Sequence, residues 1–374
     1  MDMWLVGSLL AIVILGLIMV GSSSVSVADR ELGEPFYYLW RQMLFTGMGM
    51  IAAIIVVRIP MRIWQELGPA LMILNLLLLS LVFVPGLGHS ANGSTRWIAI
   101  GSFHLQASEI VKLFSVIYLA GYLVRHNEDV RTTYAGFLRP LGLLVIISVL
   151  LLLEPDFGAA AVLITTAVAM MWLAGVRVSQ FMLLILAVAI TLALLVYTSD
   201  YRMHRLTAFL NPWADPYKSG FQLTQALIAF GRGEWFGVGL GSSVQKLFYL
   251  PEAHTDFLFA VLAEELGLVG VVAVISLFTV LIVRALRIGR AAELRERPFA
   301  GYVAYGIGIW IGLQAFINMG VNMGVLPTKG LTLPFMSYGG SSVIVMCVAM
   351  ALLVRVDYET RRDDRTIQRK TRAW

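Results

Sequence analysis

Acidic side chains stand at the start of a long apolar run and inside it. The stretch YLPEAHTDFLFAVLAEELGLVG (249–270) carries Asp256 where the run begins, and Glu264 and Glu265 within it. Helix N-capping, for which aspartate is preferred, explains Asp256 but not the other acids. On a continuous helix Glu264 lies about 12 Å beyond Asp256, a depth that requires a polar partner or cavity. We expect Glu264 and Glu265 to anchor internal polar contacts.

Two further polar groups occur beside apolar runs. In QASEIVKL, Glu109 and Lys112 lie at i and i+3 on one helix face, either as a self-neutralising pair that tolerates burial or as the lining of a polar cavity. In EPDFG, Glu154 and Asp156 occupy a tight turn. They are either solvated turn acids, or Asp156 serves the same cavity.

Cations and aromatic residues share the longest loop, residues 198–256. Arg202, Arg205 and Lys246 at this level suit an anionic headgroup such as a diphosphate, because arginine's fork matches paired oxygens. The aromatic residues fit an interface belt equally well. Within the loop, QLTQALIAFGRGEWFGVGLGSS has helical spacing that breaks into glycines, which predicts an amphipathic surface segment followed by a flexible loop.

Composition defines the class of protein that must position these groups. The 374 residues are 59% hydrophobic and 14% charged, whereas a soluble domain carries about a quarter charged residues. The chain is therefore a polytopic membrane protein. Its net charge of +5 is not a nucleic-acid signal, because the basic residues lie between and after apolar runs. The single cysteine, Cys347, excludes a disulfide within the chain.

Apolar runs long enough to span a bilayer, about 20 residues each, recur along the chain. The fold expected is all-α, with ten transmembrane helices in one domain (1–356) and a basic cytoplasmic tail (357–374). A two-to-one excess of Lys and Arg in alternate connections places both termini in the cytoplasm and the 198–256 loop outside. The runs are 4–20, 41–57, 67–84, 107–124, 139–153, 158–174, 180–197, 257–283, 299–319 and 339–356.

Taken together, these motifs resemble the SEDS family (shape, elongation, division and sporulation). PEAHTDFLFAVLAEELG, LPTKGLTLPFMSYGGSS, QASEIVKL and EPDFG carry the resemblance, which covers essentially the whole chain. YLPEAHTD and PTKGLTLPF agree with its division-type subgroup. The family's essential aspartate falls on Asp256 and its cavity residues on Glu109 and Lys112, and we add His254, Lys329 and Ser337 as substrate-binding candidates. The family's N-terminal extension is missing, so we expect a longer native N-terminus.

The resemblance implies a peptidoglycan glycosyltransferase of the bacterial inner membrane. The expected substrate is lipid II, polymerised at the septum with the active site facing the periplasm. Expected partners are a class B penicillin-binding protein, other divisome membrane proteins and membrane lipid, with no nucleic acid. Asp256 would act as general base for an inverting transfer that expels undecaprenyl diphosphate. Basic residues or a divalent cation (Mg or Mn) would offset the charge of that leaving group, with no established cofactor.

Two other functions compete with the enzyme. A lipid II flippase needs polar residues through both halves of the membrane, whereas the unusual polar residues here cluster toward the outer half. A non-catalytic septal scaffold for a transpeptidase needs no catalytic acid. The glycines of the 299–319 run offer a close approach to a partner's helix, or serve packing within the bundle.

Overall fold

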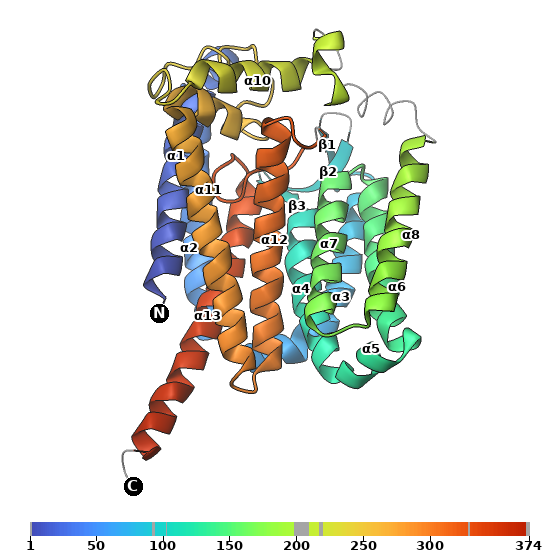
Figure 1. Ribbon diagram of the computed structural model, residues 1–374. Helices are drawn as coiled ribbons and strands as arrows, with labels where there is room; N and C mark the ends of the chain where they lie inside the picture. The colour runs from blue at the N-terminus through green and yellow to red at the C-terminus, as the bar shows by residue number, and fades with distance from the viewer. Residues whose placement is uncertain are drawn as a thin grey trace.

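Long apolar helices run side by side through most of the computed structural model (Figure 1), which describes residues 2–91, 94–101, 103–197, 209–216, 220–327 and 330–371. Within those residues, eight helices are long and apolar enough to cross a membrane. They are α1 (Met3–Leu32), α2 (Tyr37–Arg58), α3 (Met61–Val82), α4 (Ala107–Arg125), α6 (Tyr134–Leu153), α11 (Leu258–Glu293), α12 (Pro298–Asn322) and α13 (Gly340–Thr371).

Two further apolar helices stand beside these eight. They are α7 (Phe157–Leu173), which is 17 residues long, and α8 (Val178–Tyr197), which has 20 residues. Each of the ten predicted apolar runs thus coincides with one helix. The largest differences are at α1, which continues to Leu32 before Gly33 ends it with a left-handed φ of 69°, and at α13, which passes the predicted tail boundary and reaches Thr371.

A small β-sheet corrects the expectation of an all-α fold. Three antiparallel strands, β1 (Gly88–Ala91), β2 (Ser94–Ile100) and β3 (Phe103–Gln106), form the connection between α3 and α4 in the order β1-β2-β3. The connection lies outside the apolar runs, where a backbone must find hydrogen-bond partners without a helix, and a hairpin ladder supplies them.

Three helices form the centre of the bundle. In α4, 83% of the membrane-length window is buried against other parts of the chain, and in α12 and α13 67%, whereas α2 and α3 bury only 28%. Helix α12 packs against α4, α7, α11 and α13. Polar residues on these central helices therefore face protein rather than lipid.

The glycines of α12 pack inside the bundle. A Cβ on Gly306 would lie 2.5 Å from Val116, and one on Gly308 would lie 2.9 Å from the Cβ of Ala285 on α11. These close approaches show that the two glycines bring neighbouring helices together within this chain. Of the two alternatives for these positions, packing within the bundle is the correct one.

The predicted 257–283 helix is not continuous. Gly267 has φ 64° and ψ −165°, a conformation that only glycine adopts readily, and it divides α11 into a short first segment and a long second one. A Cβ at this position would lie 2.4 Å from the backbone nitrogen of Gly237. The chain therefore turns at residue 267 against the loop that follows α10.

This turn explains the acids of the first segment. The Glu264 carboxylate accepts hydrogen bonds from the backbone N–H groups of Val244 (3.2 Å) and Gln245 (3.2 Å). The Glu265 carboxylate accepts from Lys246 Nζ at 2.7 Å and Ser22 Oγ at 2.7 Å. Both anchor polar contacts, as expected, but they lie against the loop between α10 and α11 and not at the depth that a continuous helix predicted.

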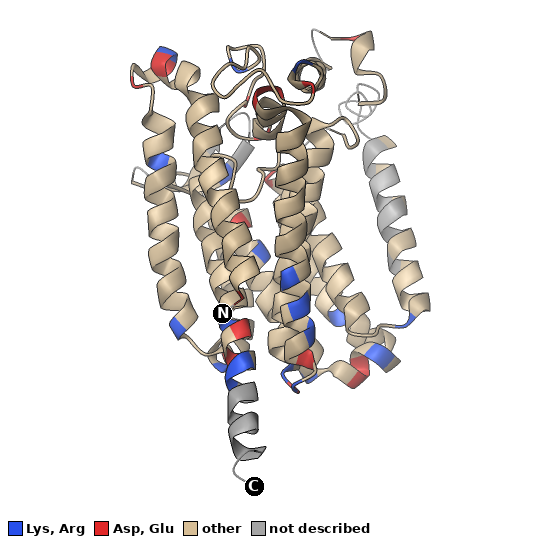
Figure 2. Ribbon diagram, turned by 60° about the vertical axis from the view of Figure 1, so that its left-hand side comes forward, with Lys and Arg blue, Asp and Glu red and all other residues tan. Residues whose placement is uncertain are grey.

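Short helices occupy both ends of the bundle. At one end, α10 (Phe221–Gly233) lies across the long helices (Figure 1) with its small and apolar face buried, so the predicted amphipathic segment is a helix. The 3-10 helix η1 (Pro212–Ala214) precedes it. At the other end, α5 (Asn127–Thr132) joins α4 to α6, and Lys and Arg gather around this end, from which α13 projects (Figure 2).

Candidate active site

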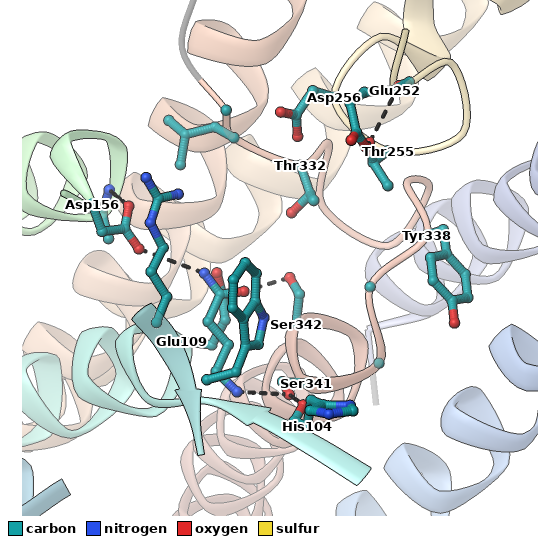
Figure 3. A pocket seen from close by; sticks show the side chains of 18 of the residues that line it. His104, Glu109, Asp156, Glu252, Thr255, Asp256, Thr332, Tyr338, Ser341 and Ser342 are labelled. Carbon is teal, nitrogen blue, oxygen red and sulfur yellow. Dashed lines mark hydrogen bonds between the residues drawn. The ribbon is translucent and has the colours of Figure 1, made fainter. Parts of the chain in front are cut away.

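A polar cavity of about 620 Å³ lies between the sheet, the turn before α11 and the segment before α13. Figure 3 shows Asp256 and Glu252 on one side of it, with Glu109, Ser342 and His104 on the other. Glu109 in the first turn of α4 and Asp156 at the N-cap of α7 also line it. The cavity therefore brings together three of the acids singled out from the sequence: Glu109, Asp156 and Asp256.

Asp256 presents its carboxylate to this cavity. The N-cap of α11 is Phe257, which makes no side-chain capping bond, so capping is not the role of the Asp256 side chain. Its carboxylate packs against Gly330, where an added Cβ would come within 2.9 Å of Oδ2. Burial, and secondly the charge of Glu252, raise the pKa of Asp256 to about 7. A carboxyl that titrates near neutral pH suits a general base.

Glu109 and Lys112 form a buried ion pair at the wall of the cavity. Lys112 Nζ donates to Glu109 Oε1 at 2.9 Å and to Gln314 Oε1 at 2.8 Å. Glu109 lines the cavity, whereas the Lys112 side chain is only 1% exposed. Ser342 Oγ donates to the other carboxylate oxygen at 3.4 Å. The structure thus combines the two interpretations, because the pair neutralises itself and its acid faces the cavity.

Both acids of the EPDFG turn are buried, so they are not solvated turn residues. Asp156 caps α7 by accepting from the N–H of Ala159 at 3.1 Å, and its second oxygen accepts from Ser108 Oγ at 2.9 Å. Glu154 has no hydrogen-bond partner for its carboxyl among the described residues. Burial, with a smaller contribution from Asp156, raises the pKa of Glu154 to about 8, which keeps this acid neutral at pH 7.

Two arginines of the cavity wall were not among the residues singled out from the sequence. Arg96 on β2 donates to the backbone carbonyls of Glu154 (3.2 Å) and Pro155 (2.7 Å), and Arg41 lies on α2. In the sequence both are read only as basic residues between apolar runs, which indicate the orientation of the chain in the membrane. The available signal was the Thr, Trp and Ile content of STRWIAI, residue types that favour a strand. That strand carries Arg96 and Trp97, which line the cavity.

Three sequence candidates lie away from the cavity wall. Lys246 is paired with Glu265, and Ser337 Oγ accepts the N–H of Leu333 at 2.9 Å within the segment before α13. The ring of His254 lies 4.7 Å from that of Tyr38, centroid to centroid, and burial lowers the pKa of this histidine. Arg202, Arg205 and Lys329 lie outside the described residues.

No metal site is formed within the described part of the chain, where no three His, Cys, Asp or Glu side chains converge. The cavity acids Glu109 and Asp156 already accept hydrogen bonds from protein groups. The arrangement instead offers one carboxyl without a protein donor among the described residues, Asp256, in a polar cavity with two guanidinium groups on its wall.

Comparison with known proteins shows the family to which the whole chain is similar. A family model described as "Cell cycle protein", for FtsW, RodA and SpoVE, matches residues 3–362. A protein of Nitrosococcus halophilus named "Probable peptidoglycan glycosyltransferase FtsW" is 61% identical over 360 residues, which cover 96% of this chain and 93% of that relative. A protein of Thioalkalivibrio sulfidiphilus with the same name is 57% identical, with 96% and 90% covered.

Solved structures share the fold. A chain from "Structural coordination of polymerization and crosslinking by a peptidoglycan synthase complex" aligns with a TM-score of 0.80 and 28% identity, covering 96% of this chain and 98% of that one. The rod shape determining protein RodA of Thermus thermophilus aligns with a TM-score of 0.70 and 28% identity, with 96% and 97% covered. The resemblance to the SEDS proteins is confirmed, and the chain belongs to the FtsW/RodA/SpoVE family of cell cycle proteins.

Proposed function

We propose that this protein is a peptidoglycan glycosyltransferase that polymerises lipid II at the division septum. Relatives at 57% and 61% identity carry that enzyme name, and a structural neighbour belongs to a peptidoglycan synthase complex. The observation that carries the proposal is the Asp256 carboxyl, which faces the cavity with a pKa of about 7.

In the proposed reaction, the hydroxyl oxygen of one lipid-linked sugar attacks the anomeric carbon of the growing chain. Asp256 takes the hydroxyl proton as the new glycosidic bond forms. The bond from the anomeric carbon to the diphosphate oxygen breaks with inversion, and the electron pair leaves with undecaprenyl diphosphate. That leaving group needs positive charge and not a proton, and Arg41 and Arg96 of the cavity wall supply it. No step of the proposal passes through a metal ion.

The proposed orientation sets the cavity toward the periplasm. In this arrangement α7 and α8 cross the membrane together with the eight longer helices, which gives ten spans and both termini in the cytoplasm. The gathering of Lys and Arg at the end from which α13 projects supports that end as cytoplasmic (Figure 2). The cavity lies toward the opposite end, near α10 and the outer loop.

The proposed partner is a class B penicillin-binding protein that crosslinks the strands made here, with other divisome membrane proteins assembled around the pair. A solved structure with this fold comes from a peptidoglycan synthase complex that coordinates polymerisation and crosslinking, and this supports such a partner.

A flippase is less well supported than an enzyme. The cavity meets the Glu109–Lys112 pair, and Lys112 is 1% exposed behind it. Beyond Lys112, Val116 on α4 and Ile307 and Ile311 on α12 are buried and apolar. The buried polar residues there, Ser115 on α4 and Asn75 on α3, are hydrogen-bonded to each other. A headgroup path through the membrane requires polar groups at that depth.

Replacing Asp256 by Asn tests the proposal. Asparagine keeps the size and polarity of the side chain but cannot accept the proton, so we expect polymerisation of labelled lipid II to fall by about 100-fold or more. The measurement uses the full-length protein purified with its transpeptidase partner, and thermal unfolding checks that the variant is folded. Glu234→Gln is the matched control, because Glu234 is an exposed acid of the outer segment that does not line the cavity.

Near wild-type polymerisation by folded Asp256→Asn would reject Asp256 as the general base. Glycan synthesis that survives Asp256→Ala in an intact complex would instead favour the scaffold, with the polymerase elsewhere in the preparation.

A further inference from the structure

Helix α12 carries three buried amide side chains at helical spacing. Gln314, Asn318 and Asn322 follow one another at i, i+4 and i+8, and each is at most 2% exposed. We call these three residues the amide stripe. A buried amide in a membrane helix is costly unless its donors and acceptors are paired. The partners of the stripe therefore indicate what it is for.

Asn322 holds the beginning of α11 from a different helix. Its Oδ1 accepts from the backbone N–H of Ala260 at 3.0 Å, in the first turn of α11. The same N–H also donates to the carbonyl of Phe257, the N-cap residue, at 3.0 Å. Its Nδ2 donates to the backbone carbonyl of Asp256 at 2.9 Å. Asn322 thus supplies the cap that an aspartate at the helix start would otherwise provide. The Asp256 carboxylate is left to face the cavity.

Asn318 joins the two segments that meet at this carboxylate. Its Nδ2 donates to the carbonyl of Asp256 at 2.8 Å and to the carbonyl of Leu331 at 2.6 Å. Leu331 follows Gly330, against which the Asp256 carboxylate packs. Both asparagines therefore hold the Asp256 carbonyl, and Asn318 also holds the carbonyl of Leu331 on the opposing segment. Neither segment is helical at these residues, so neither finds such partners in a helix of its own.

Gln314 connects the Glu109–Lys112 ion pair to the segment before α13 that lines the cavity. Its Oε1 accepts from Lys112 Nζ at 2.8 Å, and its Nε2 donates to the carbonyl of Thr332 at 3.1 Å. Every member of the stripe therefore donates to a carbonyl of a segment that lines the cavity, at residue 256, 331 or 332.

We propose that the amide stripe is the positioning element of this cavity, and that Asn318 and Asn322 are positioning residues that hold the Asp256 carboxylate in place for proton transfer. This inference rests on the proposed function. Both asparagines act through the backbone of Asp256 and neither is assigned contact with substrate. Because a displacement of about 1 Å at a reacting group can cost about 100-fold in rate, loss of either clamp is expected to act on kcat.

The first test separates positioning from helix capping at one residue. Asn322→Asp keeps an oxygen that accepts the Ala260 N–H but removes the donor to the Asp256 carbonyl. We expect Asn322→Asp and Asn318→Leu to lower kcat by about tenfold or more at the alkaline plateau of the pH profile, with KM for labelled lipid II within about twofold of wild type. The buried carboxyl of Asn322→Asp lowers stability in either case, so kcat is compared per folded molecule. A helix cap alone predicts a wild-type kcat on that basis, which would overturn the proposal.

The matched control is Asn75→Leu. Asn75 is also a fully buried amide of a membrane-length helix, and its Nδ2 donates to the carbonyl of Val111 at 3.3 Å and to Ser115 Oγ at 3.2 Å. It contacts neither cavity segment. We expect Asn75→Leu to change the melting temperature without changing kcat per folded molecule. If the stripe variants behave in the same way, they are packing residues and the proposal is wrong.

The second test does not use activity. In protein whose native Cys347 is replaced by Ala, Asp256→Cys places a thiol at the proposed position. We expect Asn318→Leu to raise its rate of reaction with a membrane-impermeant thiol reagent several-fold, and Asn75→Leu to leave that rate unchanged. An unchanged rate in the Asn318 variant would overturn positioning even if Asp256 is the base. A raised rate together with active Asp256→Asn would reject the proposed base and leave the positioning intact.

Discussion

Replacing Lys112 by Met removes the 2.9 Å partner of the Glu109 carboxylate and leaves an acid in a largely buried site, with Ser342 Oγ at 3.4 Å as its remaining donor. Glu109→Gln leaves the opposite problem, because the ammonium of Lys112 is 1% exposed and loses its counter-charge. It keeps the neutral acceptors, the new amide oxygen and Gln314 Oε1, and the ring of Trp310, 5.2 Å away. The double variant has neither charge. The three variants together measure how strongly the two side chains depend on each other.

The expected magnitude follows from burial. Breaking one side of a buried pair costs about 3–5 kcal/mol, because the remaining charge has lost its compensation, whereas removing both charges is close to neutral. With an unfolding entropy of about 2 cal/mol/K per residue, that loss lowers the melting temperature of a 374-residue chain by about 4–6 °C. The double variant should lie nearer the wild type than either single variant, which requires a coupling energy larger than the cost of one single substitution, about 3–5 kcal/mol.

Thermal unfolding of the three purified variants in one detergent provides the measurement, with Arg62→Gln as a surface control. Arg62 pairs with Glu66 at 2.9 Å, but both side chains are well exposed, so its loss should shift the melting temperature little. Additive effects of the two buried substitutions would refute the reasoning. They would show that the two charges are solvated separately, for example by water in the cavity.

The remaining predictions concern pH dependence and the break in α11. Polymerisation should decline below about pH 7, because protonated Asp256 cannot accept a proton. Glu252→Gln removes a charge that raises this pKa, so the acidic limb of the pH–rate profile should move to lower pH; a limb that stays in place would mean that another group controls it. Gly267→Ala should lower the melting temperature and the yield of folded protein sharply, because its φ of 64° and a Cβ 2.4 Å from the nitrogen of Gly237 are both unfavourable. Gly142→Ala, whose added Cβ meets no heavy atom within 4 Å, is the control, and equal melting temperatures for the two variants would contradict the role of Gly267.

The sequence by itself determined the membrane helices and the residue types that could do chemistry. A span is a local property, since a bilayer requires about 20 consecutive apolar residues, and each predicted run coincides with a helix. Glu109, Asp156 and Asp256 were recognisable because an acid beside an apolar run is costly and needs a reason. The strands of the α3–α4 connection were missed, because they are short and the longest, STRWIAI, shows no polar–apolar alternation.

Only the tertiary structure decided how these groups are arranged. Which helices pack against each other depends on contacts between segments that are far apart in the chain. The hydropathy pattern of the sequence does not reveal these contacts. The loop between α10 and α11 supplies hydrogen-bond donors to Glu264 and Glu265, so the chain can turn at Gly267 and the depth of these acids differs from that on a straight helix. Asn322 on α12 caps α11, which leaves Asp256 free to face the cavity. A helix cap supplied from another helix cannot be predicted from the sequence near the capped end, because the hydrogen bond joins positions 62 residues apart.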